Sequence, residues 1–183
     1  MKKYDMIFLD RDGTINPDPG YIANLDDFQF YEFLFPALKL LSDYGQRFSI
    51  ITNQSGVARG IIKQSQLDEI NDFIIKSFAR NKIPLYNIYV CTDHPDTATE
   101  NRKPGTGMFR QAARDYDLQL QDCLMIGDSE KDIIAGQKLA METMLVLTGE
   151  GEKTYTKIKT TAPPTYVVKN IVEGTKLLMD VKG

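Results

Sequence analysis

The stretch FLDRDGT, residues 8–14, decides the fold that we expect for this chain. It begins within a short apolar run, MIFL at residues 6–9, and changes at Asp10 to charged and turn-forming residues. An unbroken apolar run of this length is typical of a strand that is buried on both faces of a parallel sheet. Asp10 and Asp12 would then lie at the carboxyl end of that strand, where sheets of this kind bind ligands.

Four further apolar runs follow, and they alternate with segments of helical pattern. The runs are residues 48–51 (FSII), 86–91 (YNIYVC), 123–126 (CLMI) and 144–147 (MLVL), and the helical segments are 36–44, 64–80, 108–116 and 130–139. A polar segment, 149–164, forms a short helix or loop before a last strand at 166–168 and a terminal helix. The alternation predicts an α/β fold with a doubly wound, mostly parallel, Rossmann-like sheet flanked by helices.

Length and composition narrow the class of protein. The chain has 183 residues, which against roughly 150 per domain predicts one domain over 1–183. The net charge of -3, without a long basic run, disfavours nucleic-acid binding. No apolar run is long enough for a membrane helix, and two cysteines with one histidine exclude a disulfide framework. We expect a soluble, cytoplasmic protein without nucleic-acid or membrane partners; the oligomeric state stays open, with a monomer favoured.

Polar side chains stand at the ends of three of the predicted strands, beside a basic pair that precedes a helix. The groups are Asp10 and Asp12, then Thr52, Asn53, Gln54 and Ser55, then Asp128, with Arg102 and Lys103 before the helix that leads to the fourth run. Carboxylates of this kind suit Mg²⁺, and hydroxyl, amide and ammonium donors suit a phosphoryl group. Each feature alone is commoner as turn or cap chemistry, but together and in this order they indicate phosphoryl transfer.

Four motifs carry a resemblance to a known family. FLDRDGT (residues 8–14), TNQSGVARG (52–60), RKPGTGM (102–108) and IGDSEKD (126–132) resemble the motifs of the haloacid dehalogenase (HAD) superfamily. The chain is most similar to the heptose 1,7-bisphosphate phosphatases and the related histidinol-phosphate phosphatases, over about residues 5–148. Many superfamily members carry a separate cap domain, and the length of this chain leaves no room for one.

The resemblance implies a magnesium-dependent phosphatase that acts on a small sugar phosphate, with heptose 1,7-bisphosphate favoured. Asp10 would form an aspartyl phosphate, and Asp12 would act as general acid and base. Mg²⁺ would be held by the side chains of Asp10 and Asp128 and by the backbone carbonyl of Asp12. Asp132 would support the site from behind. The predicted phosphate-binding and substrate-binding residues are Asp18, Tyr21, Thr52, Asn53, Gln54, Ser55, Arg102 and Lys103.

The sequence departs from the family pattern in two places. The family commonly has a zinc loop of the form Cys-x-His, closed by Cys-x-Cys before the arginine. Here Cys91 is retained, but Asp93 stands at the histidine position, His94 follows it, and the loop ends in Thr-Glu-Asn. We therefore expect no zinc site, since three of the four ligands are changed. Ser129 also replaces a lysine that often follows the Gly-Asp pair, and Lys131 is a candidate to compensate.

Three other functions remain open from the sequence. Histidinol phosphate is the alternative substrate. A non-catalytic phospho-receiver module would also combine acids, magnesium, a threonine and a lysine, but the chain is longer than such modules and has a second aspartate, Asp12. A degenerate sugar-phosphate binder would have no need of Asp12 as an acid.

Overall fold

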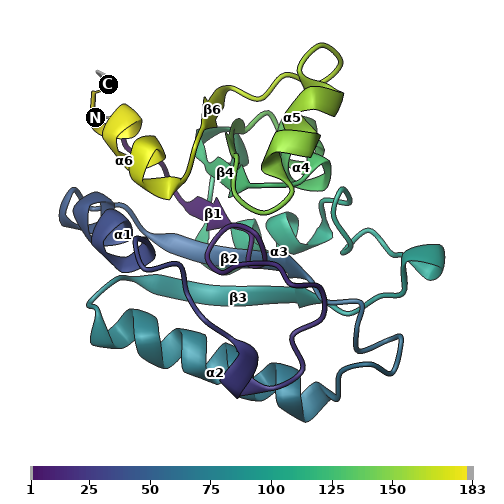
Figure 1. Ribbon diagram of the computed structural model, residues 1–183. Helices are drawn as coiled ribbons and strands as arrows, with labels where there is room; N and C mark the ends of the chain where they lie inside the picture. The colour runs from purple at the N-terminus through teal and green to yellow at the C-terminus, as the bar shows by residue number, and fades with distance from the viewer. Residues whose placement is uncertain (1, 181–183) are drawn as a thin grey trace.

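The central strand, β1 (Ile7–Leu9), is completely buried. The computed structural model describes residues 2–180 (Figure 1). Ile7 and Leu9 belong to one hydrophobic cluster and Phe8 to another. Because alternate side chains of a strand point to opposite faces, these two clusters lie on the two sides of the sheet, as the unbroken apolar run predicts.

Six strands form one sheet in the order β3-β2-β1-β4-β5-β6. The other strands are β2 (Phe48–Asn53), β3 (Leu85–Cys91), β4 (Leu124–Gly127), β5 (Glu142–Val146) and β6 (Tyr166–Val168). All five neighbouring pairs are parallel. The predicted doubly wound sheet is thus confirmed. From β1 the chain extends the sheet first toward β2 and later toward β4, which leaves a crevice at the carboxyl ends of the strands around β1.

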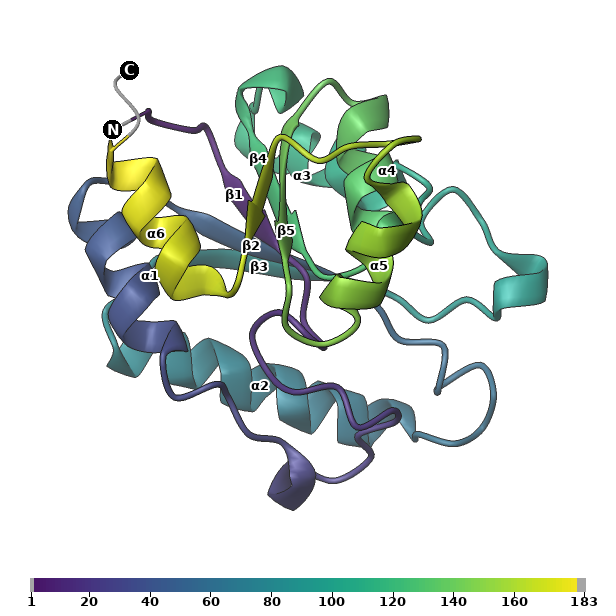
Figure 2. The ribbon, with the colours of Figure 1, turned by 45° about the horizontal axis from the view of Figure 1, so that its top comes forward.

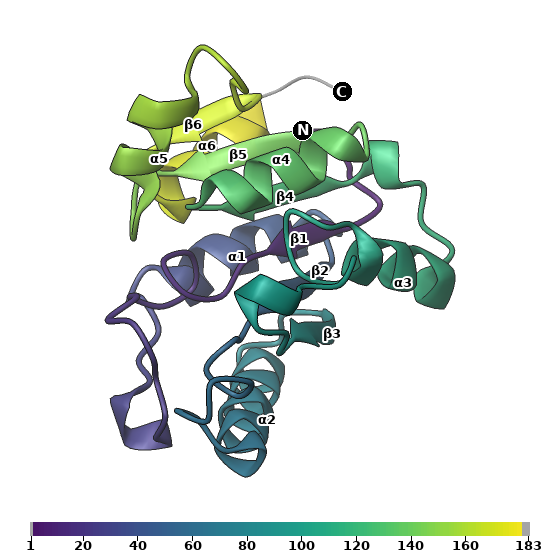
Figure 3. The same ribbon diagram turned by 90° about the vertical axis from the view of Figure 1, so that its right-hand side faces the viewer.

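Helices cover both faces of the sheet. α1 (Leu34–Asp43), α2 (Gln64–Arg80) and α6 (Ile171–Asp180) contribute to the cluster on one face, and α3 (Gly107–Tyr116), α4 (Glu130–Lys138) and α5 (Gly151–Ile158) contribute to those on the other. Figure 2 shows α1 and α6 side by side, and Figure 3 shows α3 and α4 on the opposite side of the sheet from α1.

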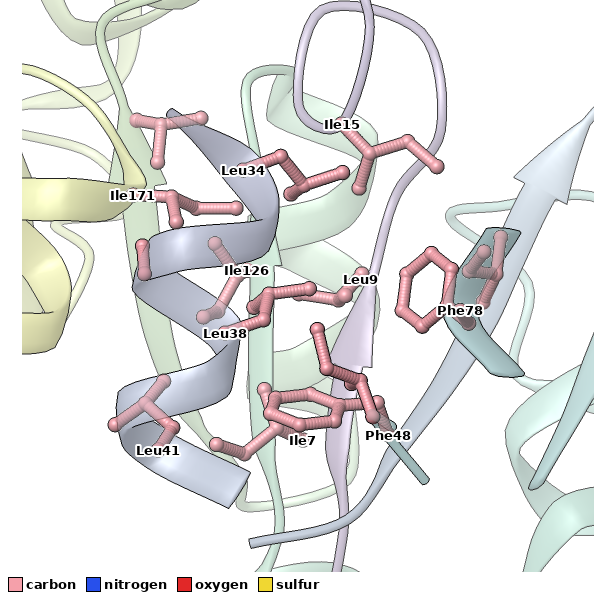
Figure 4. Close-up of a cluster of buried hydrophobic side chains, with 14 of the residues drawn as sticks. Ile7, Leu9, Ile15, Leu34, Leu38, Leu41, Phe48, Phe78, Ile126 and Ile171 are labelled. Carbon is pink, nitrogen blue, oxygen red and sulfur yellow. The ribbon is translucent and has the colours of Figure 1, made fainter. Parts of the chain in front are cut away.

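The larger core joins α1 to the middle of the sheet. Leu34, Leu38 and Leu41 of α1 are buried and face Ile7 of β1 and Ile126 of β4 (Figure 4). Full burial of an aliphatic side chain of this size contributes roughly 1.5–3 kcal/mol. This packing fixes the carboxyl ends of β1 and β4 beside each other, which positions the residues that follow them.

Predicted and observed elements differ mainly at their ends. α1 begins at Leu34 rather than at Pro36, because proline needs no hydrogen-bond partner for its nitrogen in the first turn of a helix. The polar segment 149–164 contains α5 and leads to β6 and α6, as expected. Within residues 2–180 no helix is both long and apolar enough to cross a membrane.

Candidate active site

The eleven predicted site residues line one cavity of about 290 Å³ at the carboxyl edge of the sheet. They are Asp10, Asp12, Asp18, Tyr21, Thr52, Asn53, Gln54, Ser55, Arg102, Lys103 and Asp128. The cavity is also lined by Gly20, Ser129, Lys131 and Glu150. Segments that are far apart in the chain therefore meet at the crevice beside β1, where the parallel strands end.

The register of β1 against β4 brings Asp10 and Asp128 to the same point. Leu9 pairs with Ile126, and the Asp10 amide donates to the Ile126 carbonyl at 2.9 Å. Gly13 lies at φ +78°, and a Cβ at this position would stand 2.1 Å from an Asp128 carboxylate oxygen. Only glycine combines that backbone conformation with so close an approach. The DxDG pattern thus reflects how the turn passes beside Asp128.

Lys103 is the cation of the cavity floor, a name we use for Asp10, Lys103, Asp128 and Asp132. The lysine is 3% exposed, and its Nζ lies 2.7 Å from Asp10 Oδ1, 2.6 Å from Asp132 Oδ1 and 2.7 Å from the Ile51 carbonyl oxygen. Burial alone would lower the pKa of Lys103, but the carboxylates of Asp10 and Asp132 raise it above its ordinary value. The ammonium is therefore charged at neutral pH and fixed beside Asp10.

The floor holds more negative charge than Lys103 balances. Carboxylate oxygens of Asp10, Asp128 and Asp132 lie within 4.8 Å of one another. Burial, with repulsion from Asp132, raises the pKa of Asp10 to about 7. Burial, with repulsion from Asp10, raises the pKa of Asp128 to about 8. Such a cluster favours either protons or a cation, and its oxygen donors are of the kind that magnesium prefers.

The third carboxylate of the tight cluster, beside Asp10 and Asp128, is that of Asp132. The carboxylate of Asp12, which we expected to act as acid and base, is not part of this cluster. Asp132 Oδ2 accepts from the backbone and the hydroxyl of Ser129, at 3.0 and 2.7 Å, so Asp132 caps α4 while its Oδ1 faces Lys103. Asp132 does not line the cavity, which fits the supporting role that we expected for it.

The carboxylate of Asp12 is directed by three neighbouring donors. The buried Arg11 guanidinium donates to both of its oxygens, Asn16 Nδ2 to Oδ1 at 2.9 Å, and Gln54 Nε2 to Oδ2 at 2.8 Å. Gln54 Nε2 also lies 2.8 Å from Thr52 Oγ1. Arg11 and Asn16 were not identified from the sequence, although both belong to the turn that follows β1.

Asn53 supports the site through the backbone. Its Nδ2 donates to the Lys103 carbonyl and its Oδ1 accepts from the Lys103 amide, both at 3.0 Å. The side chain therefore joins the end of β2 to the segment that carries Arg102 and Lys103. The predicted phosphate contact of Asn53 stays a prediction, and the observed contact is a positioning one.

Three exposed residues and the half-buried Arg102 form the cavity rim, a name we use for Asp18, Tyr21, Arg102 and Lys131. Tyr21 is 48% exposed, and Asp18 Oδ1 accepts from the Gly20 amide at 2.9 Å, which shapes the loop around it. Lys131 is exposed at the start of α4 and lines the cavity, as a candidate to compensate for Ser129 must do. The cavity therefore has cations both on its floor, where Lys103 lies, and at its rim, where Arg102 and Lys131 lie.

The segment expected to lack a zinc site is held by its own polar groups. Cys91 is buried in the hydrophobic cluster beside α3. The Asp93 carboxylate accepts from Thr99, and His94 Nδ1 accepts from the Asp96 amide at 3.3 Å. The expectation that no zinc binds stays a prediction.

The turn after β5 also reaches the site, although its residues were assigned no role from the sequence. The Glu150 amide donates to Asp128 Oδ2 at 2.8 Å, and Thr148 Oγ1 donates to the Gly13 carbonyl at 2.6 Å. The signal was available, because a fifth parallel strand must also end at the ligand-binding edge. This turn therefore contacts both Asp128 and the DxDG turn after β1.

The site combines acids for a cation with a buried ammonium and hydroxyl donors for an anion, and it lies at the crevice of a doubly wound sheet. This combination defines a phosphate hydrolase of the HAD class. A family model described as HAD-hydrolase-like matches residues 100–174. The chain belongs to the heptose-bisphosphate phosphatase family of the HAD superfamily, as the following similarities show, and it is a phosphoric monoester hydrolase.

Two curated relatives and one solved structure illustrate the similarity. The D-glycero-beta-D-manno-heptose-1,7-bisphosphate 7-phosphatase of Haemophilus ducreyi is 37% identical over 160 residues, covering 80% of this chain and 88% of that protein. The enzyme of the same name from Pasteurella multocida is 34% identical over the full length of both chains. The crystal structure of the D,D-heptose 1,7-bisphosphate phosphatase from B. bronchiseptica, complexed with magnesium and phosphate, matches with a TM-score of 0.87 at 31% identity, covering 95% of this chain and 97% of that one.

Proposed function

We propose that this phosphatase removes the 7-phosphate of D-glycero-D-manno-heptose 1,7-bisphosphate. The observation that carries the proposal is that the four sequence motifs meet in one cavity, in a chain 37% identical to an enzyme named for this reaction. The cavity is small and polar, as a sugar phosphate requires. We propose also that residues 1–183 work as a single domain in which short loops, rather than a separate cap, shape specificity.

Asp10 is the proposed nucleophile. It lines the cavity at the end of the buried strand β1, and Lys103 donates to its Oδ1, which leaves Oδ2 for attack. Attack on phosphorus would form a bond between the carboxylate and the phosphoryl group and break the bond to the sugar oxygen. Water would then hydrolyse the aspartyl phosphate and restore the carboxylate.

Asp12 is the proposed general acid and base. It would give a proton to the departing sugar oxygen and later take one from the attacking water. Gln54 connects it to Thr52, so the acid and a proposed phosphoryl-binding hydroxyl are held in one hydrogen-bonded group. Arg11 and Asn16 fix its carboxylate from the other side.

The acidic floor fits magnesium. The side chains of Asp10 and Asp128 and the backbone carbonyl of Asp12 would hold the ion, which would supply positive charge to the phosphoryl oxygens. Lys103, Thr52 and the residues after Thr52 would hold those oxygens from the other side, with Asn53 keeping the Lys103 backbone in place. Arg102 would contact the rest of the substrate from the rim.

The direct test is phosphate release from purified protein with magnesium present. The substrates are the alpha and beta anomers of the heptose 1,7-bisphosphate, with histidinol phosphate as the contrast. We expect turnover of the bisphosphate, with a kcat/KM at least about tenfold above that for histidinol phosphate, equivalent to about 1.4 kcal/mol of transition-state binding. Asp10→Asn should abolish turnover. Equal activity of this variant would contradict the mechanism, and a preference for histidinol phosphate would contradict the substrate.

A further inference from the structure

The loop between β3 and the Arg102–Lys103 pair closes on itself through one carboxylate. Asp93 Oδ2 accepts from the Thr99 amide at 2.8 Å and from the Thr99 hydroxyl at 2.6 Å, across the short turn η2 (Pro95–Thr97). These two hydrogen bonds, that from the side chain first, lower the pKa of Asp93 below its ordinary value. The carboxylate is therefore ionised at neutral pH, as its acceptor role requires.

Arg102 is tied to the same two residues. Its amide donates to the Thr99 carbonyl at 3.1 Å, and its Nη1 donates to the Asp93 carbonyl at 3.3 Å. Asp93, Thr99 and Arg102 thus form a closed ring of hydrogen bonds, which we call the rim ring. Arg102 lines the cavity, and the next residue, Lys103, is fixed by Asn53.

We propose that Asp93 is a positioning residue that fixes the Arg102 guanidinium at the rim for the anionic group of the substrate that does not react. The inference rests on the proposed function, because a bisphosphate presents a second phosphate when the first lies on the floor. Lys103 is committed to Asp10 and Asp132, so a second anion needs a cation nearer the rim. An arginine offers planar, paired N–H donors that match phosphate oxygens.

The expected gain in substrate affinity comes from ordering the Arg102 side chain before the substrate binds. A free arginine side chain loses rotamer freedom when it binds a ligand, and this loss of entropy weakens binding. The rim ring restrains both the backbone and the Nη1 end of Arg102, so part of that loss has already occurred in the free enzyme. Removal of the Asp93 carboxylate should therefore weaken binding of the second phosphate and leave the chemistry at Asp10 unchanged.

The experiment is a double-mutant cycle on the full-length enzyme with magnesium present. Asp93→Ala, Arg102→Ala and the double variant are compared with the wild type in steady-state kinetics on the heptose 1,7-bisphosphate. Para-nitrophenyl phosphate, which has no second anion, is the comparison substrate. Asp96→Ala is the matched control, because Asp96 is an exposed carboxylate of the same loop outside the rim ring. Asp93→Asn retains an oxygen acceptor for Thr99 and tests rescue.

We expect Asp93→Ala to raise KM for the bisphosphate about tenfold with kcat changed less than about twofold, the size of one charge-assisted hydrogen bond. The double variant should be no worse than Arg102→Ala alone, since Asp93 acts through Arg102. Asp93→Asn should restore KM to nearly its wild-type value, and Asp96→Ala should resemble the wild type. Asp93→Ala, Asp93→Asn and Asp96→Ala should hydrolyse para-nitrophenyl phosphate at the wild-type rate.

Three results would overturn the proposal: no change of KM in Asp93→Ala, effects that multiply in the double variant, or equal losses on para-nitrophenyl phosphate. The last would mean that the rim ring serves only loop folding. Failure of the proposed function is distinguishable, because the wild type itself would then release no phosphate from the bisphosphate. In that case the same cycle is measured on the sugar bisphosphate that the wild type hydrolyses best, and the same three results decide the proposal; a wild type that hydrolyses only monophosphates would overturn it.

Discussion

The floor and the rim of the cavity are built from different kinds of contact. On the floor, Lys103 is 3% exposed and lies within 2.7 Å of two carboxylates. On the rim, Arg102 is half-buried and is held by loop hydrogen bonds to Thr99 and Asp93. Charges in a buried site interact strongly, and removing one member of a buried pair is strongly destabilising because the other charge is left without a partner. Interactions between exposed charges are weakened by water and salt.

This difference separates two tasks. The chemistry of phosphoryl transfer needs charges in fixed positions away from water, which the ends of buried strands supply. Discrimination between sugar phosphates needs contacts that can change without unfolding the sheet, which loops supply. We therefore expect floor substitutions to change kcat and stability together, and rim substitutions to change KM alone.

Lys103→Met tests the floor most severely. It removes the ammonium from Asp10 and Asp132 and keeps an apolar stem of similar length. We expect kcat to fall about 10²- to 10³-fold. The free energy of unfolding should fall by about 3–5 kcal/mol, because two buried carboxylates lose their cation. Steady-state kinetics and urea denaturation measure both, with Lys176→Met on the exposed side of α6 as control. A variant with normal kcat would show that the floor does not depend on this cation.

Gly13 and Gly60 have similar φ angles, so alanine substitutions at these two positions distinguish the effect of close packing from that of backbone strain. At Gly13 (φ +78°) an added Cβ would lie 2.1 Å from Asp128, whereas at Gly60 (φ +69°), near the end of the TNQSGVARG segment, it would have nothing within 4 Å. Alanine should cost about 1 kcal/mol at Gly60, from the left-handed conformation alone. At Gly13 the cost should be about 3 kcal/mol, with most activity lost, since Asp128 must move.

Urea denaturation of Gly13→Ala and Gly60→Ala, with kcat measured on the same preparations, gives both quantities. Equal stabilities for the two variants would mean that the turn after β1 relaxes without disturbing Asp128. In that case the geometric reason given for the glycine of the DxDG pattern would be wrong.

The pH dependence of the free energy of unfolding tests whether the floor holds more carboxylates than Lys103 balances. In metal-free protein Asp10 and Asp128 keep protons up to pKa values of about 7 and 8, whereas in the unfolded chain they lose them near pH 4. The native state then binds more protons than the unfolded state between these limits, so the free energy of unfolding falls as pH rises. From pH 6 to pH 8 we expect a fall on the order of 4 kcal/mol.

Magnesium should reduce the pH dependence of the free energy of unfolding, because a bound cation replaces the protons on the carboxylates. The measurement is urea denaturation at pH 6, 7 and 8, in chelator and then in excess magnesium. Asp128→Asn, which cannot ionise, is the control and should have a shallower slope without metal. Stability that rises with pH in chelator would contradict the raised pKa values of the floor.

The sequence predicted the sheet well because its signal is local. Each strand is a short apolar run with polar residues at its carboxyl end, and parallel strands bring those ends to one edge. Asp10, Thr52 and Asp128 could therefore be placed in one cavity without coordinates. The family resemblance added the roles of Asp10 as nucleophile and of Asp12 as general acid and base, which no spacing rule provides.

Contacts that depend on the packing of distant segments could not be predicted. The place of the Asp132 carboxylate depends on the α4 cap, and that of the Asp12 carboxylate depends on its hydrogen bond from Arg11. The Thr148 and Glu150 contacts depend on the turn after β5. Hydrophobic pattern specifies that such turns exist, but it does not specify where their amides point.

The smallest expected effect lies at the exposed edge of the rim. Lys131 lines the cavity on α4, close to Ser129, which stands where relatives often have a lysine. If it supplies that cation, Lys131→Ala should raise KM for the bisphosphate about threefold at low salt, with kcat unchanged, as expected for one solvent-exposed charge pair. The effect should shrink as salt is raised toward roughly 0.5 M, because exposed charges are screened. Lys176→Ala, remote from the cavity, should leave KM unaltered at every salt concentration. A loss of kcat in Lys131→Ala would show that this residue takes part in the chemistry, as the floor residues do. The assignment of chemistry to the floor and substrate discrimination to the rim would then be wrong for α4.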